Sequence, residues 1–303
     1  MNSPDFILYV QHGWADTAAA IAAFAKTVAP PNTAIIAPDL GWFNTWLRIE
    51  PLIQRVERTA SDAIAQYPNT PIRIIGHSMG GLIWLELLHR HPEWRSRVES
   101  LVLIASPIGG ADIARLLDPW EIGLGIARDL ACNRRAIAET LAAEIPTLVI
   151  ASDIGSGSDG LILLNATKCD RAHFIGLSGL RHDRLKNLPQ LIPLIRSFWD
   201  NPVIPPQGQP NVATHLIQRL QSVPGITDAH FRDFRRARLD CTFEDGTTLH
   251  HWKHPLGFEH IFVGDRGLNC CWGGFVSWGK TKHLQQTLIE LKKDYKSFVI
   301  RNS

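Results

Sequence analysis

The sequence IRIIGHSMGGLIW, residues 72–84, combines the signals of a strand, a tight turn and a helix. The β-branched run from Ile72 to Ile75 predicts the strand, and the apolar stretch from Leu82 to Leu88 predicts the helix. Between them, a glycine stands two positions before Ser78 and another two positions after it. Small residues at this spacing permit a sharp turn that exposes the serine hydroxyl and points a helix N-terminus at it. The stretch therefore predicts a nucleophile at the end of a strand.

Similar apolar runs recur through the first 200 residues and alternate with longer amphipathic stretches. The runs are 6–11, 33–37, 72–75, 101–105, 147–151 and 174–177. This alternation is typical of βαβ units, and it predicts an α/β fold with a mostly parallel sheet flanked by helices. Because such sheets bind ligands at the carboxyl ends of their strands, we expect the chemistry in the residues that follow each run.

Composition excludes several classes of protein. The 303 residues are 45% apolar and 20% charged, which is enough for a large core and too apolar for a disordered chain. The net charge of +2 gives no reason to expect a nucleic-acid partner. Five cysteines without paired spacing, no leader-like N-terminus and no apolar run of about 18 residues predict a cytoplasmic protein without a transmembrane segment.

Three parts are expected along the chain. Residues 1–200 form the α/β domain, with a helical cap at about 107–145, where helices follow one another without a strand. The proline-rich residues 201–210 read as a linker. Residues 211–303 are expected to form a small α+β domain of unknown role with antiparallel strands. Its expected elements are helices at 212–222 and 281–298 and strands at 236–243, 247–253, 260–263 and 268–272, with 231–238 on the solvated face of a long strand.

With these features, residues 1–200 resemble the α/β-hydrolase superfamily, and GHSMGG at 76–81 resembles the box of its lipases and esterases. His12-Gly13 after the first strand, Pro38-Asp39 after the second, an acid after the fifth and a histidine before the last sheet helix also match the family. The resemblance implies an α/β-hydrolase fold with a serine esterase or lipase-like activity. Residues 211–303 resemble no family that we recognise.

A serine hydroxyl needs a base to take its proton, and the base needs an acid to orient it. The resemblance implies the chain order nucleophile, acid, histidine, which makes Ser78 the nucleophile and His182 the base. His173, at the start of the last strand, is disfavoured. Two acids follow the fifth strand. Asp159 begins a DGLI segment that resembles the family's acid-bearing segment and is preferred, while Asp153 stays open as an alternative.

The tetrahedral intermediate of acyl transfer carries a negative charge that needs hydrogen-bond donors. The resemblance assigns this oxyanion hole to the backbone N–H groups of Trp14 and Met79. Gly13 would allow the acyl group to approach closely. His12 and Asp39 are expected to hold loops, and His77 to pack beneath the turn.

Aromatic residues after the strands and in the cap predict an apolar mouth, for which Trp42 and Trp120 are the candidate substrate-binding residues. We therefore expect a small-molecule carboxylic ester with an apolar acyl group, and neither a cofactor nor a metal site. The C-terminal histidines lack the carboxylates or spaced cysteines of a metal centre.

Alternatives remain open. A thioesterase or an acyltransferase would use the same triad, and a binding or scaffold protein on a hydrolase fold would not use it. Residues 211–303 could serve protein docking or dimerisation.

Overall fold

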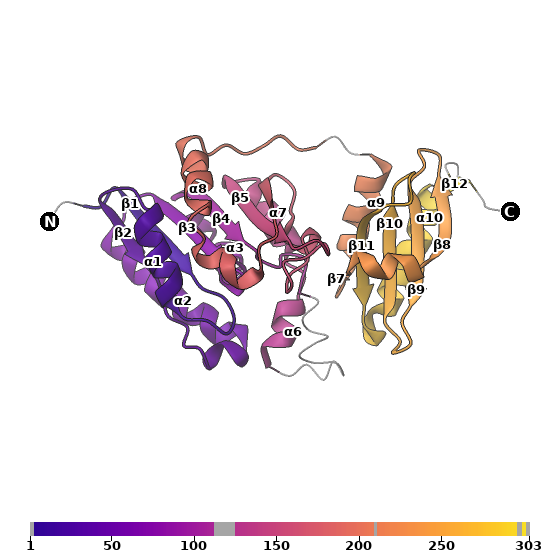
Figure 1. The fold of residues 1–303 in the computed structure, drawn as a ribbon, viewed down its shortest axis with the longest axis horizontal. Helices are drawn as coiled ribbons and strands as arrows, with labels where there is room; N and C mark the ends of the chain where they lie inside the picture. Colours follow the sequence, from indigo (N-terminus) through magenta and orange to yellow (C-terminus); the bar gives the residue numbers. More distant parts are fainter. Residues whose placement is uncertain (1–2, 112–124, 209–210, 296–298, 301–303) are drawn as a thin grey trace. The chain divides into compact units, whose positions relative to one another are not determined.

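The computed structural model describes residues 3–111, 125–208, 211–295 and 299–300. The chain divides into two compact units (Figure 1). Unit 1 comprises residues 1–108, 113–130 and 134–207, and unit 2 comprises 109–112, 131–133 and 208–303. Among the described residues, no helix has both the length and the hydropathy that crossing a membrane requires.

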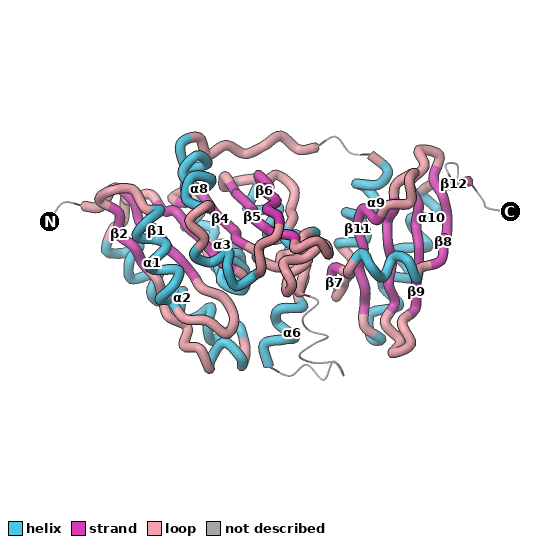
Figure 2. Tube along the Cα trace, in the orientation of Figure 1, coloured by secondary structure: helices cyan, strands magenta, loops and turns pink. Residues whose placement is uncertain are grey.

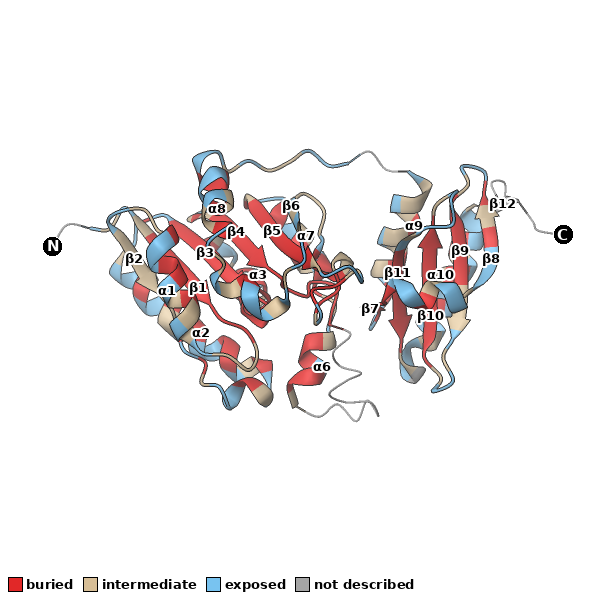
Figure 3. Ribbon diagram, viewed as in Figure 1, coloured by how far each residue is buried: buried red, intermediate tan, exposed pale blue. Residues whose placement is uncertain are grey.

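Unit 1 is built on a parallel sheet with the strand order β2-β1-β3-β4-β5-β6, in which every neighbouring pair is parallel. The inner strands are buried along almost their whole length (Figure 3), as continuous apolar runs predict. This confirms the expected fold class. The strands are β1 (Phe6–Gln11), β2 (Thr33–Ile36), β3 (Ile72–His77), β4 (Val98–Ile104), β5 (Thr147–Asp153) and β6 (His173–Ser178).

Helices cover both faces of this sheet (Figure 2). Side chains alternate across β1, so Leu8 joins a core with α1 and α8, whereas Tyr9 contacts Trp84 of α3 and Ala60 of α2 on the other face. The helices are α1 (Ala18–Val28), α2 (Ile49–Gln66), α3 (Met79–Arg90), α4 (Pro92–Arg95), α6 (Gly125–Ala131), α7 (Arg135–Ala142) and α8 (Leu191–Asp200), with 3₁₀ turns η1 (Asn44–Trp46), η2 (Asn165–Thr167) and η3 (His182–Asn187).

The segment predicted as a cap, 107–145, is described only in part, because 112–124 lie outside the described residues. Helix α7 within it packs against α3 and therefore belongs to the helical layer beside the sheet. Arg135 holds it there by donating hydrogen bonds to the carbonyl oxygens of Asn165 and Lys168. A local sequence pattern does not reveal such tertiary contacts.

Unit 2 is an antiparallel sheet with the order β12-β8-β9-β10-β11-β7. Leucines of its two long helices cover one face, and phenylalanines such as Phe262 and Phe275 form a second cluster. The elements are α9 (Val212–Gln221), β7 (Thr227–Asp228), η4 (Phe231–Arg236), β8 (Arg238–Phe243), β9 (Thr248–Lys253), β10 (Glu259–Gly264), β11 (Cys270–Val276), η5 (Trp278–Lys280), α10 (Thr281–Asp294) and β12 (Val299–Ile300).

One expectation for unit 2 is wrong. Residues 231–236 form η4 and not the face of a long strand, because the ring of His230 accepts the N–H of Arg232 and the ring of Phe234 packs against Phe262. The two-residue strands β7 and β12 were not predicted, because they are too short to show the alternation of buried and exposed residues that is typical of a strand.

Candidate active site

Ser78 forms a one-residue turn between β3, which ends at His77, and α3, which begins at Met79. Its backbone has φ 55° and ψ −126°, a conformation that a residue with a side chain rarely adopts. The turn is held because the N–H of Ser78 donates to Ile104 O at 2.8 Å, and its carbonyl accepts the N–H of Gly81 at 3.1 Å. The helix N-terminus thus begins directly beside the serine.

The glycines of the motif are required by close backbone contacts. A Cβ on Gly76 would stand 2.4 Å from the Cα of Gly81, and a Cβ on Gly80 would stand 2.3 Å from the carbonyl oxygen of Gln11. Both distances are far inside van der Waals contact, so any side chain at either position would push β3, α3 and the end of β1 apart.

The loop after β1 lies against the serine. A Cβ on Gly13 would meet the Cβ of Ser78 at 2.8 Å, which places the neighbouring Trp14 next to this turn. In the part of the chain that the structure describes, neither the N–H of Trp14 nor that of Met79 has a protein acceptor. These are the two donors that the family resemblance assigns to an oxyanion hole.

Asp159 and His182 lie in direct contact. Asp159 Oδ2 accepts the Nδ1 proton of His182 at 2.7 Å, and the main-chain N–H of His182 donates to Asp159 O at 3.0 Å. The other carboxylate oxygen, Oδ1, accepts the N–H groups of Leu161 and Ile162 at 3.0 and 2.7 Å. With 2% of its surface exposed, Asp159 is a buried carboxylate whose position is fixed from both sides.

Asp153, the alternative acid, has a different environment. Its Oδ1 accepts three backbone N–H groups, from Gly155, Ser156 and Gly157, at 2.7 to 2.9 Å. Slight burial would raise the pKa of this carboxyl, but these hydrogen bonds outweigh it and lower the pKa. No bond from Asp153 to a histidine occurs among the described residues, so this carboxylate shapes the loop that follows β5.

His77 is buried beneath the turn, as the sequence suggests, but it also contacts the base. Its Nε2 lies 3.3 Å from the main-chain oxygen of His182, and the two ring centroids are 4.9 Å apart. The motif itself gave no signal of this contact.

His12 and Asp39 hold loops. Because His12 Nε2 accepts the N–H of Leu40 at 3.0 Å, Nδ1 carries the proton and donates to Gly13 O at 3.0 Å. Complete burial lowers the pKa of His12 and keeps the ring neutral. Asp39 accepts the N–H of Gly41 and closes its own turn.

Three tryptophans gather beside the loop of Trp14. The ring of Trp46 lies 4.4 Å from that of Trp14 and 5.5 Å from that of Trp42, which is 51% exposed. Buried Thr45, which the sequence did not single out, joins the two loops because its Oγ1 accepts Ala15 N–H and donates to Trp42 O. Trp120, the other candidate substrate-binding residue, lies outside the described residues.

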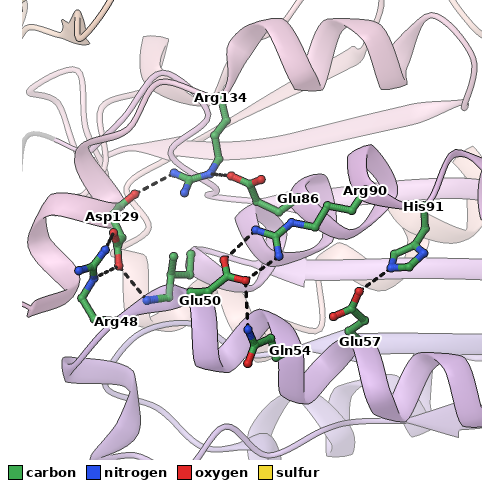
Figure 4. Close-up of polar contacts among 10 residues, drawn as sticks. Arg48, Glu50, Gln54, Glu57, Glu86, Arg90, His91, Asp129 and Arg134 are labelled. Carbon is green, nitrogen blue, oxygen red and sulfur yellow. Dashed lines mark hydrogen bonds and ion pairs between the residues drawn. The ribbon is translucent and has the colours of Figure 1, made fainter.

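A network of ion pairs and hydrogen bonds joins the helices α6, α2 and α3 (Figure 4). Asp129 of α6 accepts two bonds from Arg48 and also the N–H of Ile49, the first residue of α2. Arg134 donates to the main-chain oxygen of Asp129 and to Glu86 of α3. These arginines therefore link α6, α2 and α3.

No group of three or more His, Cys, Asp or Glu side chains suited to a metal ion occurs in residues 3–111, 125–208 and 211–295. His250 of β9, one of the C-terminal histidines, lies within hydrogen-bond distance of Thr248 Oγ1.

Comparisons with known proteins agree with this fold. Residues 2–150 match the family model of the S33 serine aminopeptidases. The structure is similar to a mature lipase from Bacillus licheniformis, at 14% identity and a TM-score of 0.50, over 65% of this chain and 92% of that chain. A Listeria innocua gene product is also similar, at 15% identity and a TM-score of 0.47, over 63% of this chain and 92% of that one. No curated protein matches the sequence.

Proposed function

We propose that the chain is a serine hydrolase that cleaves a carboxylic ester, because unit 1 has an α/β-hydrolase-like fold and residues 2–150 match the S33 serine aminopeptidase model. The observation that carries the proposal is the 2.7 Å bond between Asp159 and His182, on the loops that follow β5 and β6. In a parallel sheet these loops share an edge with the turn of Ser78.

In the first half-reaction, Asp159 holds the Nδ1 proton of His182, so the other ring nitrogen is the base. His182 Nε2 takes the hydroxyl proton while Ser78 Oγ bonds to the acyl carbon. The carbonyl oxygen becomes an anion, which the N–H groups of Trp14 and Met79 stabilise. The intermediate then breaks its bond to the alcohol oxygen, and the alcohol leaves with the proton from His182.

In the second half-reaction, a water molecule gives a proton to His182 Nε2 and attacks the acyl carbon. The bond between the acyl carbon and Ser78 Oγ breaks, and His182 returns the proton to the serine. The products are an alcohol and a carboxylic acid, and the enzyme is regenerated.

The neighbourhood of the oxyanion donors favours an apolar acyl group. Trp14, Trp42 and Trp46 form an aromatic cluster beside the Trp14 N–H, and the ring of Trp42 is half exposed. An acyl chain on this cluster would remove apolar surface from water.

The test is the initial rate on p-nitrophenyl esters of increasing acyl length, together with labelling by a fluorophosphonate probe. Ser78→Ala should lose about 10³-fold or more in kcat and all labelling. The exposed Ser96, at the end of α4, provides the matched control Ser96→Ala, which should behave as the wild type. Folded wild-type protein that neither hydrolyses these esters nor takes up the probe would contradict the proposal and favour a non-catalytic binding role.

A further inference from the structure

We propose that His77 is a positioning residue that fixes His182 against the turn of Ser78, an inference that rests on the function proposed above. His77 stands directly before Ser78, and 105 positions separate it from His182. Its Nε2 nevertheless reaches the main-chain oxygen of His182 at 3.3 Å. One side chain thus joins the strand that carries the nucleophile to the turn that carries the base.

The main chain of His182 is held on both sides. Its N–H donates to Asp159 O at 3.0 Å, and its carbonyl oxygen accepts from His77. The first bond, with the carboxylate bond to Nδ1, sets His182 relative to the acid loop. The bond from His77 sets His182 relative to the residue that precedes the nucleophile.

The protonation state of His77 follows from its partner. A carbonyl oxygen can only accept, so Nε2 of His77 carries a proton and Nδ1 is bare. Burial lowers the pKa of His77 well below its usual value, and the positive charge of the nearby Lys186 and of His182 when it is protonated lowers it further. His182 and Lys186 lie on η3, and His12 follows β1. The ring is therefore held as a neutral N–H donor to the main-chain oxygen of His182.

Packing alone does not account for an imidazole here. His77 is 4% exposed, and its Nδ1 has no partner among the described residues. A buried acceptor without a donor costs stability that an apolar side chain of similar size would avoid. The polar contact that the ring does make is the one to His182.

Loss of the His77 N–H donor should displace the imidazole of His182 but leave it in the site. The angles and distances of proton transfer depend on the placement of His182, and small displacements of a catalytic group reduce kcat strongly. Substrate binding does not use this contact, so KM should change little.

Two variants separate the donor from the volume of the ring. His77→Leu removes the donor, and His77→Gln keeps an N–H₂ group near the position of Nε2. We expect His77→Leu to lower kcat about tenfold or more with KM within twofold, and His77→Gln to recover most of the loss. His89→Leu, at an exposed histidine of α3, is the control.

A measurement that does not need turnover distinguishes this inference from the proposed function. The proton between His182 Nδ1 and Asp159 should give a downfield ¹H resonance that weakens or shifts in His77→Leu and returns in His77→Gln. If that pattern appears while esters are not hydrolysed, the proposed function fails and the positioning stands. If the resonance and kcat are the same in wild type, His77→Leu and His77→Gln, the positioning is overturned. Equal losses in both variants would also overturn it, since they would indicate a packing role only.

Discussion

At the scale of single residues, Asp153 and Asp159 differ in what their carboxylate oxygens accept. Asp159 Oδ2 accepts a hydrogen bond from an imidazole, whereas the Asp153 carboxylate accepts, among the described residues, bonds from backbone N–H groups. We expect Asp159→Asn to lower kcat about 10²-fold or more, because the amide no longer fixes the tautomer of His182 or stabilises its charge. Asp153→Asn should keep kcat within about twofold and lower stability by about 1 kcal/mol.

Steady-state kinetics and urea unfolding of both variants check this assignment. A large loss of kcat in Asp153→Asn, with Asp159→Asn active, would reverse the roles of the two acids.

Sequence predicts some of these residues better than others. Ser78 and the two glycines around it form a local motif, so the turn is visible in a few residues. The choice between the acids is not local, because Asp153 ends β5, Asp159 follows six residues later, and the path of residues 154–162 brings Asp159 to His182. The contact of His77 with His182 joins the end of β3 to the start of η3, and no spacing rule reveals it.

At the scale of elements, a side chain from another helix caps the N-terminus of α2. Its own N-cap residue, Arg48, makes no side-chain capping bond, and Asp129 of α6 accepts the N–H of Ile49 instead at 2.8 Å (Figure 4). Asp129→Ala removes this cap and the acceptor of the Arg48 pair, so we expect a loss of about 2 kcal/mol in the free energy of unfolding. Asp129→Asn, which keeps one acceptor, should lose less. Urea midpoints that equal the wild-type value in both variants would show that α6 contributes nothing to the start of α2.

His91, at the end of α3, makes stability depend on pH. Partial burial disfavours its charged form, but hydrogen bonds to Glu57 and Glu93 outweigh this and raise the pKa of His91. The folded pKa then exceeds the unfolded value of about 6.5, so the stabilisation is complete below that pH and is lost as the pH rises through the folded pKa. His91→Phe keeps a ring to stack on Trp94. We expect it to lower the urea midpoint at about pH 5.5 and to have little effect at about pH 9.

A pH-independent difference between His91→Phe and the wild type would show that the ion pairs do not contribute, and that packing alone distinguishes the two.

The elements of unit 1 were predicted because buried parallel strands are continuous apolar runs. The same reasoning failed for η4, and by itself it does not place α7. An amphipathic helix such as α7 suits a cap and a sheet-covering layer equally well, and its bonds from Arg135 to Asn165 and Lys168 decide between them. The arginines and aromatics of 231–236 suit a strand, but the ring of His230 accepts a backbone N–H and favours a turn.

At the scale of the whole molecule, each unit has a hydrophobic core of its own. One core joins β1 and β3 to α1 and α8, and the other joins the antiparallel sheet to α9 and α10. Residues 201–208, which include the last of the points at which the chain passes from unit 1 to unit 2, contain no helix or strand and are largely exposed. We expect this exposed segment to tolerate inserted residues. The entropic cost of closing a loop grows slowly with its length, by about 0.6 kcal/mol for each doubling.

The residues assigned to catalysis, Ser78, Asp159, His182, Trp14 and Met79, all belong to unit 1. We therefore expect a short Gly-Ser insertion after Gln207 to leave kcat and KM for p-nitrophenyl acetate within about twofold of the wild-type values, because the insertion changes neither the triad nor the sheet that positions it. The same insertion placed after Gly155, in the loop between Asp153 and Asp159, serves as the positive control and should abolish turnover. If the insertion after Gln207 also abolished turnover while both units stayed folded by circular dichroism, unit 2 would have to contribute to the reaction, and the site would be larger than these five residues.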